Sequence, residues 1–314
     1  MSQTATRRTV TEIPVYTLAN GHEVRLYVHE LQGARPGPVL GLVAGIHGDE
    51  PLCIEMVRQA LESLDLDELS GSVLALAVAN PYAFQWATRN TPLDMINLNR
   101  VFPGDPDGTL TEQLAHVICT AFLPRCQYLI DLHSGGNLAT VDYLYLYEGD
   151  VALSKAFGSE YMFHNKHFGG TLTGEALQRG IPALVSELGG GGQRNGFYIR
   201  KGVRGILNVM KQLEMIPGSP EVPEQQWIFT ELATLRPHHG GFMKSAITTE
   251  QLGSRVPRGT LLGEVVNPYT FQVLERIEAP FDSSILILGR ELVTKVDPGD
   301  YGYMVANAAS AREA

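Results

Sequence analysis

The sequence of 314 residues contains little cysteine and no long apolar run, and each absence excludes a class of protein. Its three cysteines, Cys53, Cys119 and Cys126, form no C-x-x-C pair, so neither a disulfide framework nor a thiolate metal site is expected. No segment approaches the ~20 apolar residues that span a bilayer, and the start, MSQTATRRTV, lacks the apolar core of a signal peptide. We therefore expect a cytoplasmic protein with no membrane partner.

Basic residues are also few, with 24 Lys and Arg against 34 Asp and Glu, which gives a formal net charge of -10. Nucleic acids and anionic lipids are usually bound through basic surfaces, so a nucleic-acid partner is not expected. Hydrophobic residues make up 44% and charged residues 18%, as in ordinary globular proteins. The length suffices for one large domain and a smaller one, and association into a homo-oligomer is compatible with this composition.

Strand and helix patterns alternate through the first two thirds of the chain. The segment PVLGLVAGI (38–46) is apolar throughout, which predicts a strand covered on both faces, and apolar residues at helical spacing follow it from 52 to 61. Further strands are predicted at 72–79, 128–133 and 183–187, a helix at 111–122, and a hairpin at 15–18 and 23–29. This order predicts an α/β fold with a mainly parallel, mixed sheet flanked by helices. Binding residues are then expected at the carboxyl ends of the strands.

The character of the sequence changes from about residue 217, where PGSPEVPEQQ reads as a linker rich in proline and acid. Short β-type runs separated by Gly and Pro follow, at 241–245, 260–266, 272–277, 284–288 and 301–305. We therefore predict a catalytic α/β domain over residues 1–217 and an all-β domain over residues 225–314.

Three side chains at predicted strand ends form a candidate metal site. His47 and Glu50 stand three residues apart between a strand and a helix, so a single turn can aim both at one point. His133 ends the strand YLIDLH and supplies a third ligand. Two histidines and one carboxylate are a common ligand set for catalytic zinc, which keeps a further position open for water. Asp131 lies on the same face of its strand as His133 and is either a partner that orients this ligand or a structural acid.

Further polar residues at the same predicted edge suggest hydrolytic chemistry. Glu187 closes the apolar run PALVSEL, where a carboxylate beside a metal-bound water could take its proton and pass it to a leaving amine. In the polar stretch TRNTPLDMINLNRVFPG, Arg89 could stabilise a developing oxyanion, and Asn99 with Arg100 could hold a carboxylate. Together these residues predict a small, anionic substrate. The remaining histidines, His164 among them, are interpreted as surface or satisfied groups.

In order, these motifs resemble those of the succinylglutamate desuccinylase/aspartoacylase family, a branch of the zinc carboxypeptidase superfamily. GIHGDEP is similar to the first ligand motif of that family, which implies zinc on His47 and Glu50, and DLHSGG is similar to the second, which implies His133. Glu187 in SELGG matches the catalytic acid. The resemblance implies a zinc carboxypeptidase-like fold, one zinc ion per chain and a C-terminal barrel-like β domain that covers the active-site cleft.

The stretch TRNTPLDMINLNRVFPG resembles a further motif of this family. The likeness implies that Arg89 polarises the scissile carbonyl while Asn99 and Arg100 bind a substrate carboxylate. Two positions depart from the family pattern: Asn90 stands where an aromatic residue is frequent, and Asn97 where the family often has aspartate.

Three functions follow as hypotheses. The first is a zinc-dependent amidohydrolase that removes an acyl group, such as acetyl or succinyl, from a small N-acylated amino acid. The second is a peptidase of the zinc carboxypeptidase type, which would use the same ligands on a longer chain. The third is a metal-free binding protein that keeps only the fold. Because three ligands and an acid are present together, we favour the first.

Overall fold

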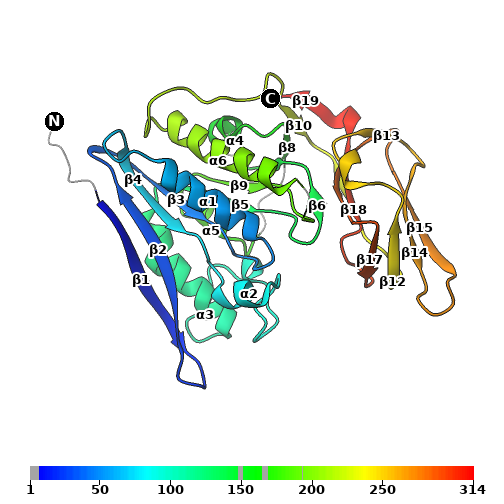
Figure 1. The fold of residues 1–314 in the computed structure, drawn as a ribbon, viewed down its shortest axis with the longest axis horizontal. Helices are drawn as coiled ribbons and strands as arrows, with labels where there is room; N and C mark the ends of the chain where they lie inside the picture. Colours follow the sequence, from blue (N-terminus) through cyan, green and yellow to red (C-terminus); the bar gives the residue numbers. More distant parts are fainter. Residues whose placement is uncertain (1–6, 148–150, 165–168, 193) are drawn as a thin grey trace.

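The computed structural model describes residues 7–147, 151–164, 169–192 and 194–314. These residues form a body with a large sheet between helices, and a group of antiparallel strands lies beside it (Figure 1). The large sheet has ten strands in the order β1 (Arg7–Thr17), β2 (Glu23–Gln32), β4 (Ser70–Leu76), β3 (Arg35–Val43), β5 (Tyr128–His133), β9 (Ala183–Glu187), β7 (Tyr143–Leu146), β8 (Tyr161–His164), β10 (Trp227–Phe229) and β19 (Ala311–Glu313).

The four central strands of this sheet, β4, β3, β5 and β9, run parallel to one another. The strands on either side mix the two directions: β2 and β7 are antiparallel to their central neighbours, and β7, β8 and β10 are parallel to one another. The predicted α/β fold with a mixed sheet is therefore confirmed. Because central strands share one direction, their carboxyl ends meet at a single edge, where the candidate residues were expected.

Helices cover both faces of the sheet. On one face pack α1 (Pro51–Ser63), α4 (Val151–Phe157) and α6 (Asn195–Gln212), and on the other α3 (Leu110–Val117) and α5 (Leu172–Gln178). Strand β3 shows why both faces need cover: Leu42 belongs to the first apolar cluster and its neighbour Val43 to the second. The helix predicted at 111–122 occurs as α3 followed by a π-helical turn, Ile118–Phe122.

The C-terminal strands form two antiparallel sheets, as the short β-type runs predicted. One contains β11 (Leu232–Leu235), β18 (Tyr303–Asn307), β16 (Ser283–Gly289) and β13 (Arg255–Pro257), with β6 (Ala139–Thr140) paired to β16. The other contains β15 (Val273–Glu278), β14 (Leu261–Val266), β12 (Gly241–Ser245) and β17 (Val293–Val296). The range 225–314 also supplies β10 and β19 to the large sheet. The division into domains at 217 and 225 remains a prediction.

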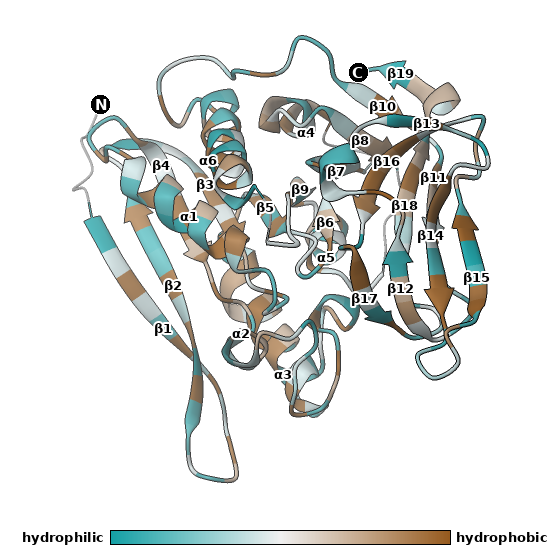
Figure 2. Cartoon of the chain, turned by 45° about the vertical axis from the view of Figure 1, so that its right-hand side comes forward, coloured by the Kyte–Doolittle hydropathy of each residue, from teal (hydrophilic) through white to brown (hydrophobic). Residues whose placement is uncertain are grey.

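An apolar seam joins the two parts of the molecule. It contains side chains of β7, β8 and β10 from the large sheet and of β16 and β18 from the C-terminal sheets. Figure 2 shows β16 coloured mainly as hydrophobic, in keeping with its buried residues Ile285, Ile287 and Leu288 in the seam and the neighbouring Leu286 in the adjacent cluster. Main-chain pairing adds to the seam, because β6 forms a short antiparallel ladder with β16. The site edge of the large sheet is thereby held against the C-terminal strands.

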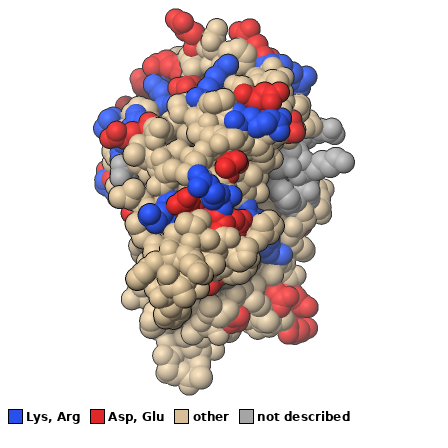
Figure 3. Space-filling model, turned by 90° about the vertical axis from the view of Figure 1, so that its right-hand side faces the viewer, with Lys and Arg blue, Asp and Glu red and all other residues tan. Residues whose placement is uncertain are grey.

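Charged side chains of both signs lie intermingled on the face of the molecule that Figure 3 presents, rather than in one basic patch. This distribution fits the acidic net charge of the sequence. Among the described residues, no helix combines the length and the apolar character needed to cross a membrane.

Candidate functional site

The first two candidate ligands lie in the turn between β3 and α1. This turn is pinned to its neighbours, because the Gly48 amide donates to the Thr88 carbonyl oxygen at 2.8 Å. A Cβ atom on Gly48 would lie 1.8 Å from the carbonyl carbon of Ala83, so only glycine allows this approach. The turn directs His47 and Glu50 inward, and Glu50, at the N-cap of α1, makes no side-chain cap to that helix.

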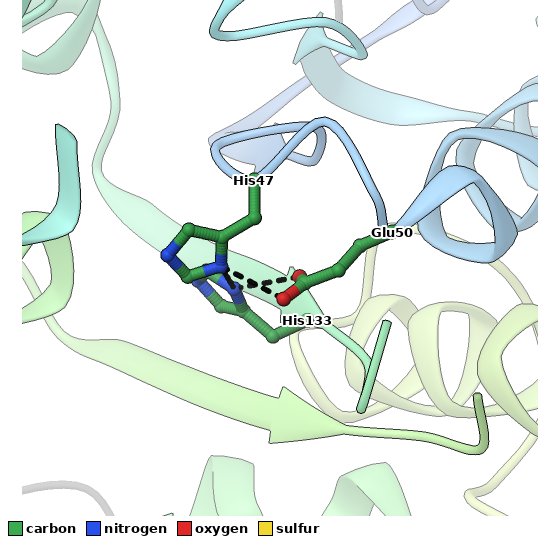
Figure 4. Close-up of side chains that lie close together, drawn as sticks. All are labelled: His47, Glu50 and His133. Atoms are coloured by element: carbon green, nitrogen blue, oxygen red, sulfur yellow. Dashed lines mark hydrogen bonds and ion pairs between the residues drawn. The ribbon is translucent and has the colours of Figure 1, made fainter. Parts of the chain in front are cut away.

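His47, Glu50 and His133 converge on one point from two neighbouring strand ends (Figure 4). The Nδ1 atom of His47 lies 2.8 Å from Oε1 of Glu50, and Nδ1 of His133 lies 3.0 Å from Oε2. The two Nδ1 atoms are 3.2 Å apart. Each of the three residues is only 2% exposed, so water compensates little of their charge.

The other ring nitrogens identify the histidine tautomers. Nε2 of His47 lies 3.1 Å from Oδ1 of Asn97, and the same oxygen accepts the main-chain N–H of Asn99 at 2.9 Å. Nε2 of His133 lies 3.1 Å from Oδ1 of Asp131. Nε2 of His47 thus faces an acceptor in hydrogen-bond geometry, and Nε2 of His133 faces a carboxylate at ion-pair distance, so both contacts favour a ring proton on Nε2. This leaves the Nδ1 lone pairs directed at Glu50.

The two Nδ1 lone pairs and the Glu50 carboxylate face one another within hydrogen-bond distance, and such a group of acceptors is stable only with a cation among them. Without a metal ion, a proton on His133 supplies part of that positive charge. Burial lowers the pKa of His133, but Asp131 and Glu50 outweigh it and hold that pKa well above its usual value. Burial also raises the pKa of Glu50, yet the charges of His47 and His133 hold it well below its ordinary range. The three side chains fit a divalent metal ion, and zinc in particular, because two neutral imidazoles and one carboxylate are a common set of protein ligands at catalytic zinc sites.

Glu187 ends β9 directly beside His133, its register partner on β5. Burial raises the pKa of Glu187 to about 8, although the nearby charge of His133 acts in the opposite direction. Among the described residues, no side chain donates a hydrogen bond to this carboxyl group. A carboxyl in this state exchanges its proton close to neutral pH, as a general acid or base must.

Arg89 approaches the ligand cluster from the loop that follows α2 (Pro81–Trp86). Its Nη1 atom lies 3.3 Å from Oε1 of Glu50 and 3.3 Å from Nδ1 of His47, while the rest of the side chain faces the cleft. The loop is anchored by Asn80, which caps α2 and donates from Nδ2 to the Thr91 hydroxyl at 2.9 Å. The guanidinium is thus held beside the cluster.

Asn99 and Arg100 lie on the short 3-10 helix Leu98–Arg100. Oδ1 of Asn99 accepts the Leu172 amide at 3.0 Å, which turns Nδ2 toward Nε2 of His133 at 3.3 Å. Because that Nε2 atom carries a proton, the two donors cannot bond each other, and the Nδ2 hydrogens remain for an acceptor in the cleft. Arg100 is exposed and donates from Nη1 to the carbonyl oxygen of Asn99 at 2.6 Å.

A cleft of about 790 Å³ opens over this cluster. Six of the seven predicted site residues line it, and the seventh, Glu50, is buried and is not part of the lining. The lining also contains four tyrosines that were not among the predicted site residues, Tyr143, Tyr145, Tyr147 and Tyr301. The alternation in YLYLY was a usable signal for the first three, because a strand places every second residue on one face. His164 also lines the cleft.

Tyr301 reaches the cleft from the C-terminal part of the chain. Arg290 donates from Nε to the carbonyl oxygen of Tyr301 at 2.5 Å, and its Nη2 lies 3.7 Å from Asp300. The guanidinium of Arg236 stacks over the Tyr301 ring, 4.2 Å from its centroid. All four residues line the cleft and lie in loops between the C-terminal strands, so these loops form its outer wall.

Comparison with known proteins gives one consistent family. The sequence model of the succinylglutamate desuccinylase/aspartoacylase catalytic domain matches residues 36–213. N-alpha-acetyl-L-2,4-diaminobutyric acid deacetylase of Halomonas elongata is 28% identical over 288 residues, which cover 84% of this chain and 80% of that protein. Residues 36–213, which the family model matches, include every predicted site residue.

Solved structures share the whole fold. The crystal structure of a succinylglutamate desuccinylase/aspartoacylase from Rhodobacter sphaeroides is 27% identical, with a TM-score of 0.83, and the match covers 96% of this chain and 95% of that one. The product-bound ectoine utilization protein EutE (DoeB) of Ruegeria pomeroyi is 23% identical, with a TM-score of 0.83 over 96% and 95% of the two chains. Both matches extend over the C-terminal sheets.

Proposed function

This chain belongs to the succinylglutamate desuccinylase/aspartoacylase family, and we propose that it is a zinc-dependent hydrolase of small N-acylated amino acids. The observation that carries the proposal is the convergence of His47, Glu50 and His133 beside the carboxyl of Glu187, to which no side chain in the described part of the chain donates a hydrogen bond. A deacylase needs such an arrangement, because amide hydrolysis requires both an activated water and a proton for the leaving nitrogen.

A zinc ion held by the three ligands would act as a Lewis acid and would lower the pKa of a water bound to it. Glu187 takes the proton of the attacking water as the oxygen–carbon bond forms. It then delivers that proton to the amide nitrogen as the carbon–nitrogen bond breaks. The products are a carboxylic acid and a free amine.

The remaining residues act on substrate charge. Arg89, held beside Glu50 and open to the cleft, donates to the carbonyl oxygen that becomes negative in the transition state. The Nδ2 group of Asn99 and the guanidinium of Arg100 hold the substrate carboxylate. Both lie on one 3-10 helix beside His133, so the carboxylate is fixed close to the reacting carbonyl.

The substrate is a small N-acyl amino acid, and an N-acetyl diamino acid is our first candidate. The relative from Halomonas elongata is named as the deacetylase of such a compound. A cleft of about 790 Å³ is large enough for a ligand of this class.

The test measures amine release from N-acetyl, N-succinyl and N-formyl amino acids by metal-depleted and zinc-restored protein. We expect hydrolysis only after zinc is restored. Hydrolysis that persists in the chelated protein would contradict the proposal, and faster cleavage of a tripeptide would favour a carboxypeptidase-type activity instead.

Glu187→Gln tests the proton-transfer role. The amide keeps the shape of the side chain and cannot accept the proton, so we expect kcat to fall by about 10²–10⁴-fold while zinc content stays unchanged. Glu62→Gln, on the exposed face of α1, is the matched control and should retain full activity. Wild-type turnover by Glu187→Gln would remove Glu187 from the mechanism.

A further inference from the structure

In the proposed metal site, the Nε2 atoms of the two histidines lie beside acceptors that differ in charge. Nε2 of His133 lies 3.1 Å from Asp131, a fully buried carboxylate whose other oxygen accepts the Thr173 hydroxyl at 3.0 Å. Nε2 of His47 lies 3.1 Å from Oδ1 of Asn97, an uncharged carboxamide. The distances are equal, but the contacts differ in charge and in geometry. Asp131 carries a charge and its Oδ1 atom lies at ion-pair distance without the angles of a hydrogen bond, whereas Asn97 is neutral and meets His47 in hydrogen-bond geometry.

The orientation of the Asn97 amide is fixed by two donors. Its Oδ1 faces the ring N–H of His47 and accepts the main-chain N–H of Asn99 at 2.9 Å. A nitrogen in this position would oppose both donors, so the atom is the oxygen. Asn97 is also the N-cap of the 3-10 helix that carries Asn99 and Arg100. One oxygen therefore links a proposed metal ligand to the proposed carboxylate-binding helix.

A hydrogen-bond acceptor on the far nitrogen of a ligating histidine does two things. It fixes the tautomer and the ring orientation, and it increases the basicity of the nitrogen that faces the metal. A carboxylate increases this basicity more than an amide does, because its negative charge stabilises the ring proton more strongly. His47 is therefore the weaker donor of the two imidazoles.

We propose that Asn97 is a positioning residue whose neutral amide orients His47 and at the same time limits the affinity of the site for its metal. The inference rests on the metal site of the proposed function. With a carboxylate behind each histidine, the ion would be held more tightly. The Asn97 amide orients the His47 ring as a carboxylate would, but it adds no negative charge behind that ring.

The experiment measures the zinc dissociation constant by competition with a fluorescent chelator at one fixed pH. Asn97→Asp is close to isosteric and adds only the charge, so we expect zinc to bind about 10-fold more tightly than in the wild type. Asn90→Asp is the matched control: it makes the same change in the same loop, where Asn90 contacts the Met95 carbonyl oxygen and no histidine. We expect this control to bind zinc as the wild type does.

Asp131→Asn provides the reciprocal measurement and keeps the test valid should Asn97→Asp not fold. With both acceptors neutral, zinc should bind about 10–100-fold more weakly. A role that is only structural would let Asn97→Asp weaken binding or leave it unchanged, and either result overturns the inference. Equal tightening by Asn90→Asp, or unchanged affinity in Asp131→Asn, overturns it as well. Absence of zinc binding by the wild type would instead overturn the proposed metal site itself.

Discussion

The partly buried carboxyl of Glu187 accepts no side-chain hydrogen bond from the residues that the structure describes, and this residue lowers the stability of the fold. The large sheet brings Glu187 beside His133, and burial raises the pKa of Glu187 to about 8 from an ordinary value of 4.5. The ionised form is thus more costly in the folded chain than in the unfolded one. Such costs are typical of catalytic groups, whose environment is selected for chemistry rather than for stability.

The sign of the pH effect follows from this shift. Below pH 4.5 the carboxyl is protonated in both states and costs little; above that value the unfolded chain ionises first, so stability is lost as the pH rises toward 8. Glu187→Gln removes the loss. We expect the metal-free variant to exceed the metal-free wild type in free energy of unfolding by on the order of 2 kcal/mol at pH 8 and by much less at pH 4.5. Urea denaturation at the two pH values checks this, and a variant less stable at pH 8 would refute the assigned burial cost.

At the scale of elements, the N-cap residue of α2, Asn80, also holds the loop that carries Arg89 into the site. Asn80 accepts the Ala83 amide and bonds to Thr91, so one side chain both caps α2 and holds the loop that carries Arg89. Asn80→Ala should cost about 1 kcal/mol of stability for the lost cap. It should also lower kcat/KM about 10-fold or more, because a misplaced catalytic group loses its alignment.

The N-cap of α3 supplies the matched control for this prediction. Thr109 forms a capping box with Glu112 on an exposed turn. Thr109→Ala should lose a similar amount of stability without loss of activity. Thermal unfolding and steady-state kinetics of both variants separate the two effects, and equal kinetic losses would show that Asn80 acts through stability alone.

The bounds of secondary-structure elements were predicted most accurately for short, buried strands. The strands predicted at 128–133 and 183–187 occur with those bounds as β5 and β9, because apolar residues on both faces mark a central parallel strand. The helix α6 was missed. Its glycines Gly202 and Gly205 weaken the helical signal, yet a Cβ on either would collide with Met56 or Phe157 of the neighbouring helices. Close packing of α6 against its neighbours in the folded chain therefore requires glycine at these two positions, and the sequence alone does not reveal that packing.

The candidate site divides in the same way. Its inner residues could be predicted, because each follows a recognisable strand and carries an unusual polar side chain. The outer wall could not, since Arg236 and Tyr301 enter the cleft only after the C-terminal sheets pack against β7 and β8. Contacts between segments this far apart in sequence leave no local pattern.

At the scale of the whole molecule, the seam between the two parts predicts how the protein unfolds. Besides the shared apolar cluster, the Val141 amide and the Thr140 hydroxyl both donate to the Ile287 carbonyl oxygen, at 2.9 and 3.0 Å. The strands β10 and β19 also sit at the edge of the large sheet although they flank the C-terminal sheets in sequence. We expect one cooperative transition, with coincident denaturation curves from far-ultraviolet circular dichroism and tryptophan fluorescence. Two separated transitions would instead favour independent domains.

The central claim is that His47, Glu50 and His133 bind one divalent ion together. Metal content after zinc loading and dialysis, measured by inductively coupled plasma mass spectrometry, tests it most directly. We expect one zinc per chain in the wild type and in the loop control His22→Ala, and a loss of stoichiometric zinc in His133→Ala. Full zinc content in His133→Ala, or none in the wild type, would contradict the account.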